Sequence, residues 1–323
     1  MSDMKQPPPM PAYIERGGEQ ELVPPCGLYG SQFYVFLLQG NRSNLQSLID
    51  RLFNKPSGGA LKYEAFSSYV AVMFTHVDRL TSAEPAQGWA AYGDIAMWVP
   101  VIDRQGLLPS FKMYPVYMVV DNGSTMATGR EIYGFPKEMG WFLEPQIPEF
   151  IGDLAVDVTG YQTGSPTKQS IRSRLYTVQR DTGDTPAAFS PIASARAVFD
   201  ELEKAMSLLH AGNFKDEFIV GFDIFKNLFS VPALGLKQIR DIQDPAKAVF
   251  QSVVEAPLGL TKFRDARLLT DRYTFTLSDL ASHPVADDTG LKIGAQDVAF
   301  AFWIYADFEL GLGKSNWQSP PTV

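Results

Sequence analysis

Apolar and polar residues alternate along most of the chain, and this alternation is the main structural signal in the sequence. A period of two residues indicates strands with one buried face, and the runs here are rich in aromatic and β-branched residues and end at turn residues. We expect strands at 32–38, 69–74, 95–101, 114–120, 175–179, 249–254, 273–277 and 299–305.

A few segments have helical spacing instead. Residues 45–52 place leucine and isoleucine on one helical face after a capping Ser43. A second apolar stripe runs from 198 to 209 and stops before Gly212, and a weaker helical candidate lies at 226–229. Many strands, few helices and no regular strand–helix alternation predict an α+β, mostly β fold, an antiparallel barrel or sandwich with peripheral helices.

The chain shows no internal repeat and no linker, so we expect one domain over 25–314. Residues 1–24 are rich in Pro, Gly and Glu and lack an apolar period, which predicts a flexible amino-terminal arm. Residues 315–323 have the same character and predict a carboxy-terminal tail.

Composition narrows the class of protein. The 323 residues are 45% hydrophobic and 20% charged, as expected for a folded chain, and the net charge of −8 argues against nucleic-acid or anionic-membrane partners. One cysteine, Cys26, and three dispersed histidines argue against a disulfide framework or a metal site. Without a secretory leader or a run of 18 apolar residues, the expected compartment is the cytoplasm.

One segment is similar in sequence to part of a nucleotide-binding motif. Residues 311–315 read GLGKS, like the end of a phosphate-binding loop. Phe308 stands where that motif needs its first glycine, and the Pro-rich sequence that follows cannot form the required helix. We therefore do not predict nucleotide binding.

The segment with the clearest chemistry is 121–140, where Lys137 follows Phe-Pro among aromatic residues. An apolar setting disfavours the charged form of a lysine, which would prepare its amine as a nucleophile. The alternative is a lysine whose stem packs on aromatic rings while its amine reaches water. Composition alone favours this second interpretation.

The sequence GREIYGFPKEMG, residues 129–140, resembles the active-site segment of the acetoacetate decarboxylase superfamily, whose pattern is GRE-x-x-(G/A)-(Y/F)-P-K. Residues 92–101 resemble the family strand that carries a catalytic carboxylate six residues before Pro-Val, and Asp94 occupies that position in place of Glu. A looser similarity covers 235–240 and the strands through Tyr305. The resemblance spans about 25–312, with an insertion at about 160–215.

This resemblance implies a cone-like, closed antiparallel β-barrel and a Schiff base between Lys137 and a keto acid. A neutral amine is required, and an unperturbed lysine is neutral only about once in ~2,500 molecules at pH 7. The protonated imine then accepts the electron pair released by bond cleavage or proton loss, so no metal or organic cofactor is required. The resemblance also implies a homo-oligomer and a small-molecule keto acid substrate.

Three positions depart from the family pattern. Glu138 replaces the second lysine of the family's decarboxylases, and its carboxylate would oppose a neutral Lys137 if both faced one side. Adjacent residues in an extended chain face apart, so the two side chains need not meet. The family's first-strand arginine aligns with Ser31 or Gln32, and Asp94 is one methylene shorter than Glu.

The remaining candidates have less specific roles. Arg130 is a candidate for the missing arginine's role, as is Lys112, although an Arg130–Glu131 ion pair that holds the lysine segment is the favoured interpretation. Trp98, Tyr133 and Phe135 are expected to form walls of the pocket or the core. Asp94 is either the proton-handling residue or simply a strand-start residue after a glycine.

Three functions remain open at this stage. The first is decarboxylation of a β-keto acid through Lys137, with Asp94 transferring protons. The second uses the same lysine for aldol condensation or dehydration on a 2-oxo acid such as pyruvate. The third is a non-catalytic protein that binds a small apolar molecule. The large apolar residues near Lys137 predict a substrate with more hydrocarbon than acetoacetate.

Overall fold

The computed structural model describes residues 11–14, 16–17, 21–84, 87–106, 109–144, 153–181, 188–194, 196–198, 200–201, 204 and 230–320. Its strands are β1 (Cys26–Gln39), β2 (Tyr63–Ala65), β3 (Tyr69–Thr81), β4 (Trp89–Asp103), β5 (Ser110–Val120), β6 (Lys137–Leu143), β7 (Leu154–Gly160), β8 (Ile171–Arg180), β9 (Phe189–Pro191), β10 (Ser230–Arg240), β11 (Ala248–Leu269), β12 (Tyr273–Leu277), β13 (Gly294–Asp297), β14 (Phe300–Leu310) and β15 (Lys314–Gln318). Its helical elements are α1 (Arg42–Ile49), α2 (Gly123–Thr128) and α5 (Val285–Thr289), with π-helical turns η1 (Asp50–Asn54) and η3 (Gly129–Tyr133).

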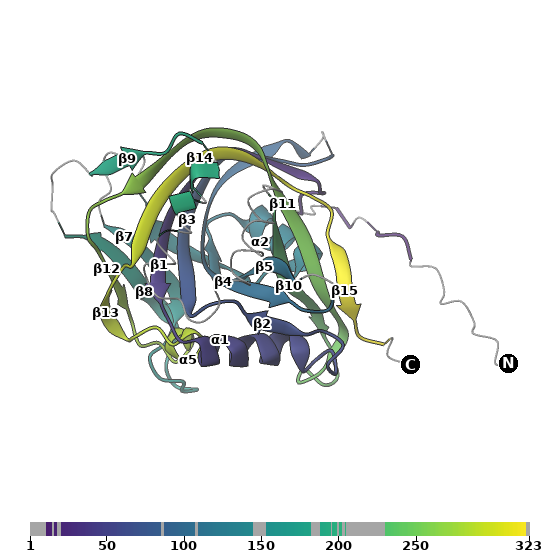
Figure 1. Ribbon diagram of the computed structural model, residues 1–323. Coiled ribbons are helices and arrows are strands. Elements are labelled where there is room, and N and C mark those ends of the chain that lie inside the picture. The colour runs from purple at the N-terminus through teal and green to yellow at the C-terminus, as the bar shows by residue number, and fades with distance from the viewer. Residues whose placement is uncertain are drawn as a thin grey trace.

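Strand β5 joins the sheet into a ring because both of its edges are paired. β4 runs antiparallel along one edge, while β10 and β6 share the other edge in parallel. From β4 the pairing continues through β3, β1, β14, β11 and β10 back to β5, so these strands close on themselves (Figure 1). The mostly β, barrel-like fold with peripheral helices that the sequence predicts is therefore confirmed.

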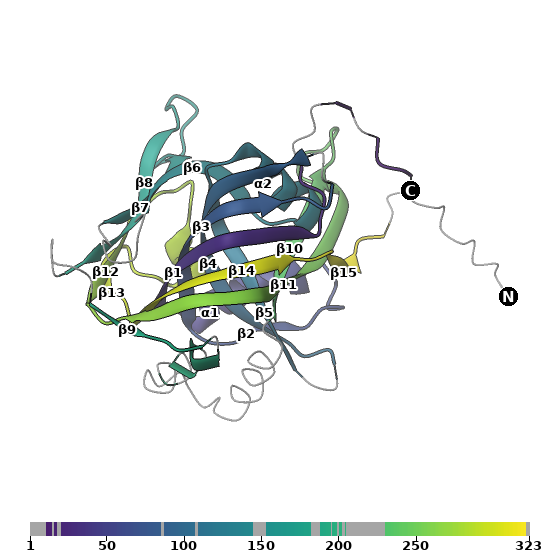
Figure 2. The same ribbon diagram turned by 90° about the horizontal axis from the view of Figure 1, so that it is seen from above.

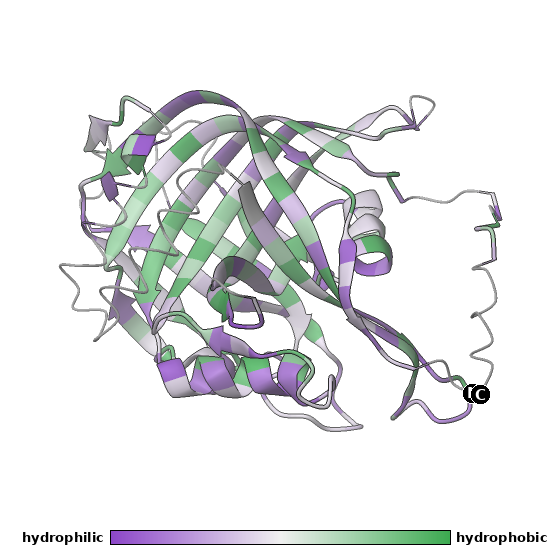
Figure 3. Ribbon diagram, turned by 45° about the vertical axis from the view of Figure 1, so that its right-hand side comes forward, coloured by the Kyte–Doolittle hydropathy of each residue, from purple (hydrophilic) through white to green (hydrophobic). Residues whose placement is uncertain are grey.

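The ring is supported by the alternation seen in the sequence. Hydrophobic and hydrophilic residues alternate along its long strands (Figure 3), as a half-buried strand requires. The buried faces of β1, β3, β4, β7, β8 and β12 contribute to one large apolar cluster, which α1 joins through Leu45, Leu48 and Ile49. Seen from above, β1, β14 and β11 run side by side (Figure 2), in agreement with their pairing.

All eight predicted strand segments lie within observed strands, apart from Ala299, one residue before β14, but one strand is much longer than expected. β11 continues to Leu269, where charged residues interrupt the apolar pattern that was used to predict it as 249–254. Those residues form ion pairs on the strand surface, such as Arg264 with Asp307 at 2.7 Å. In this part of β11, polar contacts to neighbouring strands stabilise the strand pairing, which is why the apolar pattern did not predict it.

The first predicted helix is present, but its cap is Asn41 and not Ser43. Asn41 has extended φ and ψ, and its Oδ1 atom accepts hydrogen bonds from the amides of Ser43 and Asn44. α1 then passes directly into η1. Of the helix predicted from 198 to 209, the described residues 198, 200, 201 and 204 are helical, and the candidate at 226–229 lies outside the described residues.

The predicted carboxy-terminal tail contains a strand. β15 pairs antiparallel with β11, and the Ser252 hydroxyl donates to the carbonyl of Trp317 at 3.0 Å. Trp317 also packs against the main core, which the Pro-rich composition around it concealed. Among the described residues, no helix has the length and apolar character needed to cross a membrane.

Candidate active site

The amine of Lys137 and the carboxylate of Asp94 form a buried ion pair, with 3.0 Å between Nζ and Oδ2. Each residue is 6% exposed. Lys137 begins β6 and Asp94 lies on β4, so the two strands flank β5. Asp94 pairs with Val120 and Lys137 with Met118, and these registers bring two residues far apart in sequence to one place in the ring.

A short helical connection makes β6 start at the lysine. β5 ends at Val120, and Asn122 caps α2 by accepting hydrogen bonds from the amides of Ser124 and Thr125. α2 passes into η3, and the Phe135 amide then donates to the Gly129 carbonyl at 2.8 Å. The crossover returns the chain beside β5 and delivers Lys137 to the inside of the ring.

The glycines of the GREIYGFPK segment are required by close contacts. A Cβ atom on Gly129 would lie 2.5 Å from Cδ of Lys137, so this glycine gives the lysine stem its path. Gly134 has φ of +72°, and a Cβ there would lie 2.2 Å from the Lys237 amide nitrogen. Arg130 donates from Nη1 to the Lys137 carbonyl at 3.0 Å. The segment is therefore built to fix one lysine.

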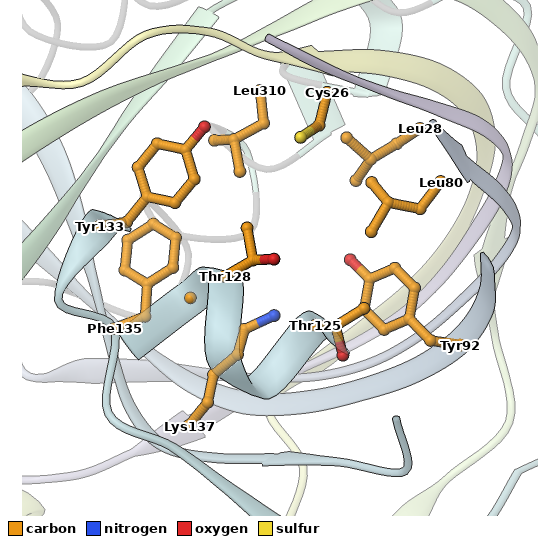
Figure 4. Close-up of a pocket in the computed structure, with 11 residues that line it drawn as sticks. Cys26, Leu28, Leu80, Tyr92, Thr125, Thr128, Tyr133, Phe135, Lys137 and Leu310 are labelled. Carbon is orange, nitrogen blue, oxygen red and sulfur yellow. The ribbon is translucent and has the colours of Figure 1, made fainter. Parts of the chain in front are cut away.

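Lys137 faces a small cavity of about 30 Å³ (Figure 4). The walls are mainly hydrophobic, and Tyr133 stacks on Phe135 with 5.3 Å between ring centroids. The residues that line the cavity are Cys26, Leu28, Leu80, Tyr92, Thr125, Thr128, Gly129, Tyr133, Phe135, Lys137 and Leu310. Among these described residues, Lys137 carries the single cationic side chain.

Burial controls the proton affinity of the groups around the lysine. It raises the pKa of Asp94, an effect that the nearby Lys137 opposes. Burial also raises the pKa of the Cys26 thiol from 9.0 to about 11, and it raises the pKa of Tyr92 well above 10.0, with the Asp94 charge adding to the effect. The cysteine and tyrosine are accordingly neutral at physiological pH.

The sequence-predicted site residues divide into two groups. Lys137, Asp94, Tyr133 and Phe135 meet at the cavity or beside it. The Tyr133 hydroxyl donates to the Gly311 carbonyl at 3.0 Å, so it acts as a fixed wall.

Glu138, the candidate at the position of the family's second lysine, faces away from the cavity. Its Oε1 atom lies 2.9 Å from Nε2 of His283, because neighbouring residues on a strand point to opposite sides. Arg130 and Glu131 are exposed on η3 and do not line the cavity. Trp98 is half-buried and packs between two apolar clusters.

Lys112 cannot replace the missing arginine. It is buried, but its amine lies 2.5 Å from Glu255 and 3.6 Å from Asp103, away from the cavity lining. Glu255 is also bound by Lys314 and Asn316, so this is a closed polar network. Among the residues the structure describes, no group of three or more His, Cys, Asp or Glu side chains could hold a metal ion.

Sequence reasoning missed most of the cavity wall. Cys26 and Leu28 come from β1, Leu80 from β3 and Leu310 from β14, and nothing local to these residues marks them. Tyr92 could have been found, because it lies two residues before Asp94 and therefore on the same face of β4.

The family model described as acetoacetate decarboxylase (ADC) matches residues 10–144, which include Asp94 and Lys137. The amino-terminal part of the chain is therefore similar in sequence to acetoacetate decarboxylases. No curated protein matches its sequence.

Solved structures share the fold of this chain. ADC from Legionella pneumophila has a TM-score of 0.59 at 16% identity, covering 96% of this chain and 93% of that chain. A second ADC structure has a TM-score of 0.58 at 14% identity, covering 93% and 92%. MppR, an enduracididine biosynthesis enzyme complexed with the condensation product of pyruvate and imidazole 4-carboxaldehyde, has a TM-score of 0.56 at 13% identity, covering 93% and 92%.

Proposed function

We propose that the protein is a Schiff-base lyase that decarboxylates a β-keto acid through Lys137. The observation that carries this proposal is the buried Lys137 amine, 3.0 Å from Asp94 and facing a hydrophobic cavity. Burial penalises an ion pair relative to a neutral amine beside a carboxylic acid. A proton that moves from Lys137 to Asp94 therefore creates the nucleophile and leaves the acid that the next step needs.

Imine formation uses both members of the pair. The neutral amine of Lys137 attacks the ketone carbon, and Asp94 supplies the proton with which the ketone oxygen leaves as water. The products are a protonated imine and an Asp94 carboxylate, which remains as its counter-ion. The bond to the substrate carboxylate then breaks, its electron pair passes to the imine nitrogen, and carbon dioxide and an enamine remain.

The charge of the cavity favours decarboxylation over condensation of a 2-oxo acid. A condensing enzyme keeps the substrate carboxylate through the whole reaction, so a second cation would have to balance it. Among the lining residues described, that second cation is absent, because Glu138 replaces the lysine and points to His283. In decarboxylation the carboxylate loses its charge as it leaves, which a hydrophobic cavity promotes.

Borohydride reduction in the presence of keto acids tests this proposal. The protein would be treated with acetoacetate, longer or aryl β-keto acids, and pyruvate with an aldehyde, and the modified residue identified by peptide mass spectrometry. We expect an adduct on Lys137, absent in K137A, with a β-keto acid that also releases carbon dioxide. An adduct and an unsaturated product from pyruvate with an aldehyde, without carbon dioxide release, would instead support condensation. No adduct from folded protein between pH 6 and 9 would support the non-catalytic alternative.

A further inference from the structure

The hydroxyl groups around the cavity differ in whether they are already engaged. Thr125 and Thr128 donate to the carbonyls of Asn122 and Ser124. Tyr133 donates to Gly311. In the part of the chain that the structure describes, the hydroxyl of Tyr92 makes no hydrogen bond. This residue is nevertheless buried, with 7% of its surface exposed, and a buried hydroxyl usually has a partner.

That unused hydroxyl is aimed at the reaction site. Figure 4 shows it pointing into the cavity beside the Lys137 amine. The amine lies 5.2 Å from the centroid of the Tyr92 ring. Any carbonyl compound bound to Nζ places its next carbon, the one that becomes nucleophilic in the enamine, two bonds from this nitrogen and within the space bordered by the Tyr92 hydroxyl.

We propose that Tyr92 is a second catalytic residue, which transfers a proton to and from the carbon next to the imine. This inference rests on the proposed imine chemistry of Lys137. Asp94 is placed at the nitrogen, where water is lost and regained, whereas Tyr92 borders the cavity in which the carbon chain lies. The two proton transfers of the cycle thus have separate donors.

The proton balance of the cycle is complete. The enamine carbon takes the proton of the Tyr92 hydroxyl, which regenerates the protonated imine and leaves a phenolate beside this cation. Water then hydrolyses the imine, Asp94 takes up the released proton, and the ketone leaves. Solvent returns one proton to Tyr92, which equals the one proton consumed when a keto carboxylate becomes a ketone and carbon dioxide.

Neighbouring groups support a donor role. Burial and the Asp94 charge raise the pKa of Tyr92 well above 10.0, so the hydroxyl is protonated before the imine forms. The developing phenolate is stabilised only once the cationic imine is present at Lys137. Cys26 lines the same cavity, but its Sγ lies 4.0 Å from the Leu22 carbonyl and 3.9 Å from the Val23 carbonyl, facing the amino-terminal segment.

Hydrogen exchange of a simple ketone separates the two proposals. In the proposed cycle, enzyme-dependent exchange of the hydrogens next to the carbonyl of butanone, above the rate in D₂O buffer alone, passes through the enamine, whereas borohydride trapping of the same ketone reports the imine alone. We expect Y92F to trap butanone on Lys137 like the wild type but to exchange its hydrogens about 100-fold more slowly. Y273F is the matched control, because the Tyr273 hydroxyl is also buried without a hydrogen-bond partner in the described structure.

The outcomes are distinguishable. Normal trapping with wild-type exchange in Y92F overturns the role of Tyr92 and leaves the imine proposal standing. No trapping in the wild type overturns both. If Y92F does not fold, 3,5-difluorotyrosine at position 92 gives a more acidic phenol of similar size, and the pH profile of exchange is expected to move to lower pH. An unmoved profile would contradict proton transfer by Tyr92.

Discussion

His283 binds the carboxylate of Glu138 at 2.9 Å on the side of β6 opposite to the Lys137 amine. Nδ1 of the same imidazole lies 2.8 Å from the hydroxyl of Ser282, so the ring is held at both nitrogens. Position 138, where the family's decarboxylases have a second lysine, therefore belongs to a polar contact outside the cavity.

Replacing Glu138 by lysine restores the family's pair of adjacent lysines but is not expected to restore a second cation in the cavity. The strand geometry sends the side chain towards His283, so borohydride trapping in E138K is expected to stay within about threefold of wild type. Loss of the charged hydrogen bond, about 2 kcal/mol, is expected to lower Tm by about 3 °C. E138Q, which keeps an acceptor, is the control, and faster trapping in E138K alone would show that the side chain reaches the cavity.

Asp94 is expected to be essential for imine formation. D94N keeps the size of the side chain but cannot accept a proton from Lys137, so keto acid turnover is expected to fall by about 100-fold or more. D94E retains a carboxylate and is expected to keep more activity than D94N. Equal turnover in D94N and wild type would mean that the ion pair is structural.

The pH dependence of trapping has a predicted sign. Because burial raises the pKa of Asp94, the carboxylate gains a proton at a higher pH than an ordinary Asp, for which the value is 3.8. Below that pH both Asp94 and Lys137 carry a proton, so Asp94 can no longer accept the proton of Lys137. Trapping is therefore expected to fall as the pH drops, with a midpoint above 3.8. The measurement is the extent of trapping of the wild type as a function of pH. D94N is expected to lack this acid limb.

Gly129 should control the position of the lysine. A methyl group in G129A would overlap the Lys137 stem at 2.5 Å, and the amine would have to move away from Asp94. A displacement of this kind is expected to reduce trapping by about 100-fold while the protein stays folded. G259A is the matched control, since a Cβ at Gly259 meets nothing within 4 Å. Similar trapping in G129A and G259A would show that the contact is unimportant.

Cys26 should be an unreactive thiol. At pH 8, a pKa of about 11 in place of 9.0 leaves roughly 100-fold less thiolate, and burial reduces access further. Alkylation by iodoacetamide, followed by intact mass, is expected to be slow at pH 8 in the native protein and to speed up as the pH approaches 11. The unfolded protein supplies the reference rate, and fast native alkylation at pH 8 would contradict the buried environment.

Much of the fold could be predicted from the sequence, because the alternation of apolar and polar residues shows directly which face of a strand is buried. The segment that holds Lys137 was identified by its resemblance to the family pattern, and its two glycines are explained by close contacts, of Gly129 with Lys137 and of Gly134 with Lys237. Asp94 was identified by resemblance, and its distance to Lys137 depends on strand registers that no local pattern encodes.

The rest depended on contacts between distant strands. The burial of Leu80 and Leu310 at the cavity follows from ring closure, and both look like ordinary strand residues in the sequence. Glu138 and His283 are separated by 145 positions, so their contact could not be anticipated. β15 was missed because its residues are mostly exposed and show no apolar period, so only its pairing with β11 identifies it as a strand.

The cavity wall combines Cys26 and Leu28 from the first strand with Leu310 from β14, which are separated by most of the sequence. During synthesis, the segment that carries Lys137 leaves the ribosome long before β14 exists. Until that strand inserts between β1 and β11, the cavity in front of the lysine lacks part of its wall. A nascent chain that stalls before β14 would therefore carry the complete lysine motif without the cavity wall that Leu310 supplies.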